Sequence, residues 1–320
     1  MLKFLGRAVA GFALFLVSFV AVGGLMSAAG HPAPRGKMVD IGEGRQLRLV
    51  CEGPAQGATG DRPVVWLEAG AFGFAADWGA TQEALTKAGW RSCAYDRAGM
   101  GFSPPGPAPR DGLAIVSDFE KLVAASGERG PFIVVGHSMA GLRLREYAGR
   151  NPDKIAGLVL VDAATADASE TEAFKPFIQA FATASRWAAR GASLGLYKPL
   201  VYTSLGDKIG LPPAAKAEKR WAFANGRHNR TAAAEVELWS ESARQAVAVP
   251  AYDPAWPVAV VTAGPVQGRE KRKAMQSAPA ERSAHGYVDH VEAATHTRLL
   301  GEQFAGHIVK AVEFVGGRGG

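Results

Sequence analysis

Four short and almost continuous apolar runs constrain the fold of this chain more than any other feature. They are PVVWLEAG (63–70), PFIVVG (131–136), IAGLVLVDA (155–163) and WPVAVVTAG (256–264). Runs of this length without polar alternation are typical of strands buried on both faces. Helical patterns separate the first three runs, and strands that alternate with helices form a parallel sheet covered on both faces. The sequence therefore predicts an α/β fold with a doubly wound, mostly parallel sheet.

The same patterns divide the chain into four parts. Strand and helix signals alternate in residues 36–163 and resume in residues 255–316, where the last helix is expected over about 298–315. Residues 164–254 are rich in Ala, Arg and Trp, with helical stretches and few strand signals. We therefore expect a core in two pieces, interrupted by a helical cap insertion, and preceded by a separate N-terminal segment over residues 1–30.

The N-terminal segment has the composition of a membrane helix. Lys3 and Arg7 precede an uncharged run of 19 residues, AVAGFALFLVSFVAVGGLM (8–26). A helix of that length spans roughly 28 Å, about the thickness of a bilayer core. Ser27 and Ala29 put small side chains where a signal peptidase would cut, so a cleaved signal peptide stays an alternative to the favoured uncleaved anchor. Either alternative places the rest of the chain outside the cytoplasm, membrane-anchored or secreted.

The charge and motif content exclude several function classes. The formal net charge is +6 and the sequence pI is about 9.4. No Lys/Arg run is interleaved with aromatics, so we interpret the charge as a solvated surface that favours an anionic membrane face, and expect no nucleic-acid partner. The two cysteines lack metal-ligand spacing and no glycine-rich phosphate loop is present, so neither a metal nor another cofactor is expected. The sequence does not predict an oligomeric state.

Two serines lie in motifs that resemble the turn of a nucleophilic serine, G-x-S-x-G. Ser193 matches it strictly in GASLG, whereas VVGHSMAG has Ala140 where the last glycine belongs. The chemistry needs a serine at the sharp bend between a buried strand and a helix. Ser138 follows an apolar strand run and precedes a helical pattern, but Ser193 follows helical spacing. We predict Ser138 as the nucleophile, with Gly141 helping to accommodate Ala140, and Ser193 as part of a turn in the insertion.

The stretch VVGHSMAG, preceded by YDRAGMGFSPPG (95–106), resembles the α/β-hydrolase fold superfamily. Within it, the chain resembles single-domain serine hydrolases that carry a helical cap between strands six and seven. The resemblance covers residues 38–163 well and 255–315 less closely. It implies that Asp96 and Arg97 pair to fix the loop that contains them.

The topology that the resemblance implies makes the second and fourth strands neighbours. Cys51 lies at the end of one and Cys93 within the other, so a disulfide is expected between them.

A serine hydroxyl needs an imidazole to take its proton and return it. Of the seven histidines, His296 lies between the last strand and the last helix, where the histidine of an α/β hydrolase follows the serine and the acid in chain order. We predict His296 as the general base. His137, next to Ser138, is expected to line the site.

A carboxylate must orient that imidazole and stabilise its cation. In most of these enzymes the acid follows strand seven, but that strand here ends VVTAGPVQGRE, where the first acid is Glu270. Part of the superfamily uses an acid at the end of strand six instead, and Asp162 in LVLVDA occupies that place. A buried carboxylate there calls for a cationic neighbour. We favour Asp162 and keep Glu270 as the alternative acid; that neither serves also stays open.

An oxyanion hole needs two backbone N–H groups aimed at the developing negative charge. One is expected from Met139, which follows the nucleophile. The resemblance places the other in the loop after strand three, where counting from Gly70 in EAGAFG gives Ala71.

These residues predict a serine hydrolase of carboxylic esters or related small acyl compounds that works through an acyl-enzyme. Haloalkane dehalogenases and epoxide hydrolases share the fold but have an Asp nucleophile, which Ser138 argues against. An amidase or peptidase, a lyase that reuses the triad, and a non-catalytic small-ligand binder stay as alternatives. Trp187, Trp221 and Trp239 indicate either a cap over an apolar pocket or simple packing. The acyl group of the substrate is not encoded in a motif.

Overall fold

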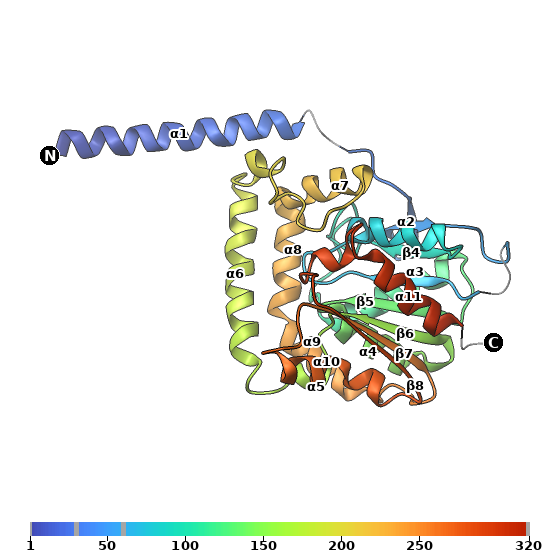
Figure 1. Ribbon diagram of the computed structural model, residues 1–320. Helices are drawn as coiled ribbons and strands as arrows, with labels where there is room; N and C mark the ends of the chain where they lie inside the picture. Colours follow the sequence, from blue (N-terminus) through green and yellow to red (C-terminus); the bar gives the residue numbers. More distant parts are fainter. Residues whose placement is uncertain (1, 29–31, 59–61, 318–320) are drawn as a thin grey trace.

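The computed structural model describes residues 2–28, 32–58 and 62–317 (Figure 1). In these residues eight strands form one sheet in the order β1-β2-β4-β3-β5-β6-β7-β8. β2 runs antiparallel to β1 and β4, and the pairs from β4 onward are parallel, so the predicted α/β fold with a mostly parallel sheet is confirmed. The strands are β1 (Lys37–Gly42), β2 (Arg45–Glu52), β3 (Val65–Glu68), β4 (Ser92–Tyr95), β5 (Phe132–His137), β6 (Ile155–Val161), β7 (Pro257–Ala263) and β8 (His285–Val291).

Helices cover both faces of the sheet, because the central strands are apolar on both sides. In β5, Ile133 and Val135 pack into one buried cluster, whereas Phe132 and Val134 pack into the other. This is the two-residue period of a strand. The first cluster is closed by α2 (Gly79–Lys87) and α11 (Ala305–Gly316), and the second by α3 (Gly112–Ser126), α4 (Ala140–Arg150) and α10 (Glu270–Glu281).

The segment between β6 and β7 is helical throughout its regular structure. Its α-helices are α5 (Ala166–Ser169), α6 (Lys175–Ser193), α7 (Pro213–Phe223), α8 (Gly226–Glu237) and α9 (Trp239–Ala248), with a 3-10 helix, η3 (Lys198–Leu200). α6 and α8 pack along each other, and α9 packs on α4 of the core.

The last helix is shorter than expected. A 3-10 turn, η4 (Arg298–Leu300), comes first, and α11 begins only at Ala305. A Cβ on Gly301 would lie 2.1 Å from the carbonyl oxygen of Ile209, and Glu302 N donates to Gly210 O at 3.1 Å. This close contact with the segment before α7 interrupts the helical pattern.

The N-terminal helix α1 (Leu2–Ala28) extends away from the rest of the molecule (Figure 1). Residues Lys3–Leu25 have a mean hydropathy of 2.3, and they form the one helix among the described residues that is long and apolar enough to cross a membrane. Such a helix near the N-terminus also fits a signal sequence. Ala29, part of the expected cleavage motif, lies outside the described residues.

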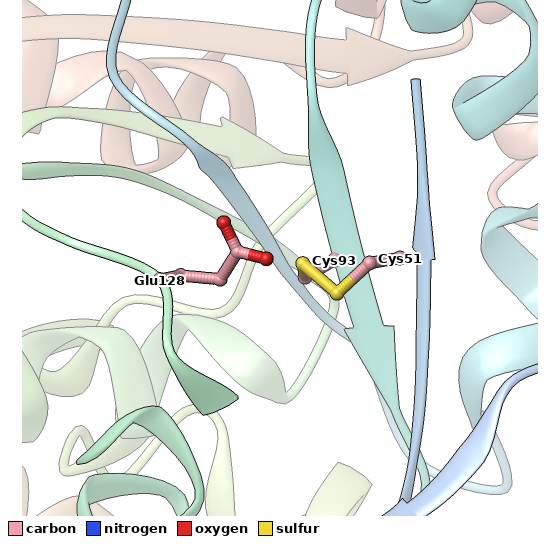
Figure 2. Close-up of side chains that lie close together, drawn as sticks. All are labelled: Cys51, Cys93 and Glu128. Carbon is pink, nitrogen blue, oxygen red and sulfur yellow. A yellow bond between two sulfur atoms is a disulfide. The ribbon is translucent and has the colours of Figure 1, made fainter. Parts of the chain in front are cut away.

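The expected disulfide is present. Cys51 of β2 and Cys93 of β4 are opposite each other in the antiparallel pair and are bonded. Glu128 lies beside the two sulfurs (Figure 2), but its carboxylate accepts hydrogen bonds from Arg91. Because both sulfurs are used in the disulfide, this cluster offers no thiolate to a metal.

Candidate active site

Ser138 lies at a sharp turn between a buried strand and a helix. It follows β5 directly and has a φ of 57°, a backbone conformation that is strained for a residue with a side chain. The turn is held by a hydrogen bond from Ser138 N to Val161 O at 3.1 Å and one from Ala164 N to Ser138 O at 2.9 Å. Strained backbone that its surroundings hold in place is common at functional sites.

Two glycines let the elements approach at this turn. A Cβ on Gly136 would lie 2.8 Å from a methyl of Leu144, and one on Gly141 would lie 2.2 Å from the carbonyl oxygen of Ala164. Gly141 is therefore needed because the backbone of Ala164 lies directly against it. The sequence had suggested a different reason, namely that Gly141 helps to accommodate Ala140. Ala140 itself is buried at the start of α4.

The structure brings Ser138, His296 and Asp162 together in one chain of hydrogen bonds. His296 Nε2 lies 3.0 Å from Ser138 Oγ, and His296 Nδ1 lies 2.6 Å from Asp162 Oδ2. Asp162 follows β6 with a φ of 40°, and His296 lies in the loop between β8 and η4. All three thus occupy the edge where the parallel strands end, the usual ligand edge of such sheets.

Asp162 is buried but its carboxylate is well supplied with donors. Gln276 Nε2 donates to Oδ1 at 2.9 Å, and Ala263 N at 3.3 Å. Burial pushes the pKa of Asp162 up, but the hydrogen bond and charge of His296, together with these two donors, hold the pKa well below its usual range. Asp162 is therefore an anion at neutral pH. Gln276 was not found from the sequence, because a glutamine in a charged helix carries no motif.

Glu270, the alternative acid, lies elsewhere. It begins α10, and its Oε1 accepts a hydrogen bond from Gly268 N at 2.7 Å. Backbone hydrogen bonds lower the pKa of its fully exposed carboxyl. Within the described residues it makes no contact with His296.

His137 packs against His296. Their rings lie 4.4 Å apart between centroids, and His137 Nε2 lies 3.0 Å from the backbone oxygen of His296. Burial, followed by the charge of His296, lowers the pKa of His137 to about 3. The ring is therefore neutral at pH 7, and its Nε2–H donates to that oxygen, which holds the loop that carries His296.

The residues expected to form an oxyanion hole lie on either side of Ser138. A Cβ on Gly70 would be only 2.8 Å from Ser138 Cβ, so the loop after β3 lies directly against the serine. The backbone N–H groups of Met139 and Ala71 have no hydrogen-bond acceptor in the part of the chain that the structure describes. Two free N–H groups beside a serine are what a negatively charged oxygen requires.

Arg97 holds the loop after β3 in its conformation. Its guanidinium donates to the backbone oxygens of Ala69 at 2.8 Å, Gly70 at 3.0 Å and Gly73 at 3.2 Å. In a trans peptide the N–H points opposite to the C=O. By fixing the carbonyl of Gly70, Arg97 therefore also fixes the direction of the Ala71 N–H.

The expected pairing of Asp96 with Arg97 is wrong. Asp96 pairs with Arg48 at 2.9 Å, whereas Arg97 pairs with Glu68 at 3.1 Å and with Glu235 of α8 at 2.8 Å. Side chains of neighbouring residues at a strand end point to opposite sides, so Asp96 and Arg97 do not form an ion pair although they are adjacent in sequence.

The helical segment between β6 and β7 brings aromatic side chains next to the site. Phe181 of α6 lies 6.4 Å from Phe72, the residue after Ala71, and 6.1 Å from Trp239, between ring centroids. Met139 belongs to the same apolar cluster. The other two tryptophans of this segment are not part of this aromatic group. Trp187 is 64% exposed, and Trp221 stacks on Phe102.

Ser193, the strict pattern match, is the last residue of α6. Its Oγ accepts a hydrogen bond from Arg230 at 2.7 Å. The structure places neither a histidine nor a strand end beside it among the described residues.

Comparison with known proteins agrees with this architecture. A family model described as the alpha/beta hydrolase fold matches residues 62–188. Among solved structures, an esterase from Thermogutta terrifontis aligns with a TM-score of 0.60 and 18% identity over 89% of this chain and 100% of its own. The Cif epoxide hydrolase from Acinetobacter nosocomialis aligns with a TM-score of 0.67 and 17% identity over 92% and 95%. These matches show that the chain has the α/β-hydrolase fold.

Curated relatives match only part of the chain. The probable transporter efuK of Hormonema carpetanum is 36% identical over 132 residues, which are 40% of this chain and 18% of that protein. An uncharacterized vacuolar membrane protein of Saccharomyces cerevisiae is 28% identical over 137 residues, 39% of this chain and 21% of that protein. The chain thus matches about a fifth of the length of these relatives.

Proposed function

We propose that the protein is a serine hydrolase that cleaves carboxylic esters or related acyl compounds through an acyl-enzyme. The observation that carries this proposal is the hydrogen-bond chain from Ser138 through His296 to Asp162, with the serine at a strained strand-to-helix turn. A serine, a base that contacts it and an acid that orients the base are the parts that nucleophilic catalysis needs.

The first half of the reaction follows from the tautomer of His296. Asp162 is an anion, so it accepts the Nδ1–H, which leaves Nε2 free to take the proton of Ser138 across 3.0 Å. The Oγ forms a bond to the substrate carbonyl carbon, and the carbonyl electron pair moves onto oxygen. The N–H groups of Met139 and Ala71 stabilise this oxyanion, while Asp162 stabilises the imidazolium.

The second half returns the enzyme to its starting state. When the oxyanion collapses, the bond to the leaving alcohol breaks and His296 gives the alcohol its proton. Water then attacks the acyl-enzyme, His296 takes a proton from that water, and Ser138 recovers the proton as the acid is released.

Two features favour this reaction over the alternatives on the same fold. A serine occupies the place where epoxide hydrolases and haloalkane dehalogenases have an Asp nucleophile, so an alkyl-enzyme ester is not the intermediate. A binder without catalysis has no use for a strained serine hydrogen-bonded to an oriented imidazole. An amidase or peptidase would use the same residues, so the assay compares the turnover of ester substrates with that of amide substrates.

We further propose how the chain is organised around this site. Residues 36–163 and 255–316 form the catalytic core, and residues 164–254 form a cap over it. The apolar helix α1 anchors the chain in a membrane, with the catalytic part on the extracytoplasmic side. An apolar helix of sufficient length and a disulfide, which persists in oxidising compartments, support this location.

The test is turnover of p-nitrophenyl esters of increasing acyl length, with p-nitroanilides of the same acyl groups to score amidase activity. Ser138→Ala should reduce ester turnover by about 10⁴-fold or more. Ser193→Ala is the matched control and should retain activity. Ester turnover that survives in Ser138→Ala would contradict the proposal.

A further inference from the structure

The outward face of α6 is apolar and uncovered. Phe177 is 51% exposed, Trp187 64% and Leu194, at the end of the helix, 69%. Ala180 and Ala184 are exposed between them at helical spacing. We call these five residues the outer stripe. Exposed apolar residues that form one stripe mark a surface that meets a partner more often than scattered ones do.

A groove lined by arginines runs beside the outer stripe, between α6 and α8. Arg186 and Arg190 line it from α6 and Arg230 from α8, with Glu237 as its one acidic residue, and its volume is about 730 Å³. α6 itself carries no acidic side chain. The guanidinium of Arg190 lies over the ring of Trp187 at 4.8 Å, so charge and apolar surface adjoin. The pair of helices therefore offers cations next to an apolar stripe.

The membrane helix meets the cap at one end of α6. A Cβ on Gly23 of α1 would lie 2.5 Å from the ring of Pro199, and one on Gly195, directly after α6, would lie 3.4 Å from Val20. The candidate span Lys3–Leu25 covers roughly 34 Å as a helix, slightly more than a bilayer core, and its contacts with the cap lie in its last two turns. A bilayer around that part of α1 thus ends about where α1 touches the cap.

The arrangement of the helices places α6 at that boundary. In Figure 1, α6 lies near the C-terminal end of α1 and runs across the direction of α1. The sheet lies on the side of α6 that is away from the N-terminus of α1. α6 is therefore the element of the folded body that lies nearest to the bilayer surface.

We propose that α6 docks on the surface of a bilayer rich in anionic lipids. The outer stripe enters the boundary between headgroups and acyl chains, where Trp is enriched, and the arginine groove holds lipid phosphates. This inference goes beyond ester hydrolysis. It rests on the proposed placement of α1 in the membrane, and not on Ser138 being a nucleophile.

Docking of α6 would couple the lipid surface to the site. Phe177 on the outer stripe packs on Phe181, whose ring in turn lies near Phe72 in the loop beside Ser138. These three aromatic rings thus connect the lipid-facing side of α6 with the loop after β3.

The test uses a fluorescent probe on the full chain in vesicles. Ala184→Cys places a thiol in the outer stripe, and Ala125→Cys places one on the exposed side of α3 as the matched control. The native cysteines are in the disulfide, so a nitrobenzoxadiazole maleimide reacts with the new thiol. Vesicles contain phosphatidylglycerol, with or without a phospholipid that has a nitroxide near its headgroup. Flotation shows whether each protein is bound to the vesicles.

We expect a blue-shifted emission and at least about twofold nitroxide quenching for the probe at position 184, and neither effect at position 125. Equal, water-like emission at both positions in floated vesicles would overturn the docking of α6. If the protein does not float with the vesicles, α1 is not in the membrane, and the docking of α6 is overturned as well. That result leaves the hydrolase proposal unaffected.

The role of the arginines is tested by lipid composition. Quenching at position 184 should weaken in vesicles of phosphatidylcholine alone, and Arg186→Gln combined with Arg190→Gln should remove the preference for anionic lipid. Lys310→Gln, an exposed cation on α11, should leave it unchanged. Equal quenching in both lipids would overturn the anionic headgroup contact.

Discussion

His296 Nδ1 lies 2.6 Å from a carboxylate oxygen of Asp162, the residue that follows β6. The position after β7, where most α/β hydrolases carry the acid, is filled here by a glycine-containing turn. The two neighbouring parallel strands end at the same edge, so an acid after either one reaches the same imidazole. In the proposed triad the acid thus follows β6 in place of β7, and it reaches the imidazole at the same edge of the sheet.

Replacement of this acid gives the first prediction. Asp162→Asn leaves the size of the side chain unchanged but allows its amide to donate to Nδ1, which selects the wrong tautomer of His296. We expect kcat for a p-nitrophenyl ester to fall by about 10³- to 10⁴-fold.

Glu270→Gln is the matched control, because Glu270 is exposed and contacts Gly268. It should stay within about threefold of the parent chain. If Glu270→Gln removes activity and Asp162→Asn does not, the acid has been assigned to the wrong strand.

Much of the fold followed from the sequence, because buried parallel strands leave an unmistakable apolar run. β3, β6 and β7 lie within their runs, and β5 extends one residue beyond its run, to His137. Ser138, His296 and Asp162 could be predicted to lie together because each adjoins the end of such a run or the last strand. The disulfide followed from strand order once the fold family was recognised.

The supporting contacts could not be read in the same way. Arg97, Glu235 and Gln276 act over separations of 138 and 114 residues, and no spacing links them to the site. The break before α11 depends on a contact between Gly301 and the insertion, which has no local signal. Long-range contacts of buried polar groups are specified by packing rather than by a pattern.

The second prediction concerns the loop that carries Ala71. Arg97→Lys keeps the charge, but the compact ammonium lacks the fixed planar fork of donors that holds the three backbone oxygens. The Ala71 N–H then loses its fixed direction, and we expect kcat to fall by about 10- to 100-fold with a smaller change in KM.

Arg91→Lys is the control, since Arg91 forms a bidentate pair with Glu128 at a distance from Ser138. A similar loss of kcat in both variants would show that general destabilisation, and not the conformation of the loop after β3, is responsible.

The third prediction is a pH dependence of stability. His228 of α8 accepts a hydrogen bond from Gly101 N, and burial, followed by the charge of Lys219, lowers its pKa to about 3. Between pH 6.5 and about 3 the unfolded chain binds a proton that the folded chain does not. The free energy of unfolding therefore falls as the pH falls, by about 1.4 kcal/mol per pH unit for this group.

Denaturant unfolding at a series of pH values tests this dependence. His228→Gln should be less stable than the parent at pH 8, because the glutamine does not reproduce the ring's packing. Its stability should then decline less steeply below pH 6.5. Parallel curves for the two proteins would mean that His228 is not buried in its neutral form.

The most direct test of the central claim is covalent labelling of the nucleophile. A fluorophosphonate reacts only with an activated serine, and peptide mapping by mass spectrometry identifies which serine carries the phosphonyl group. We predict one labelled residue, Ser138, with labelling lost in Ser138→Ala and kept in Ser193→Ala. A folded chain that takes no label, or takes it on Ser193, would contradict the account.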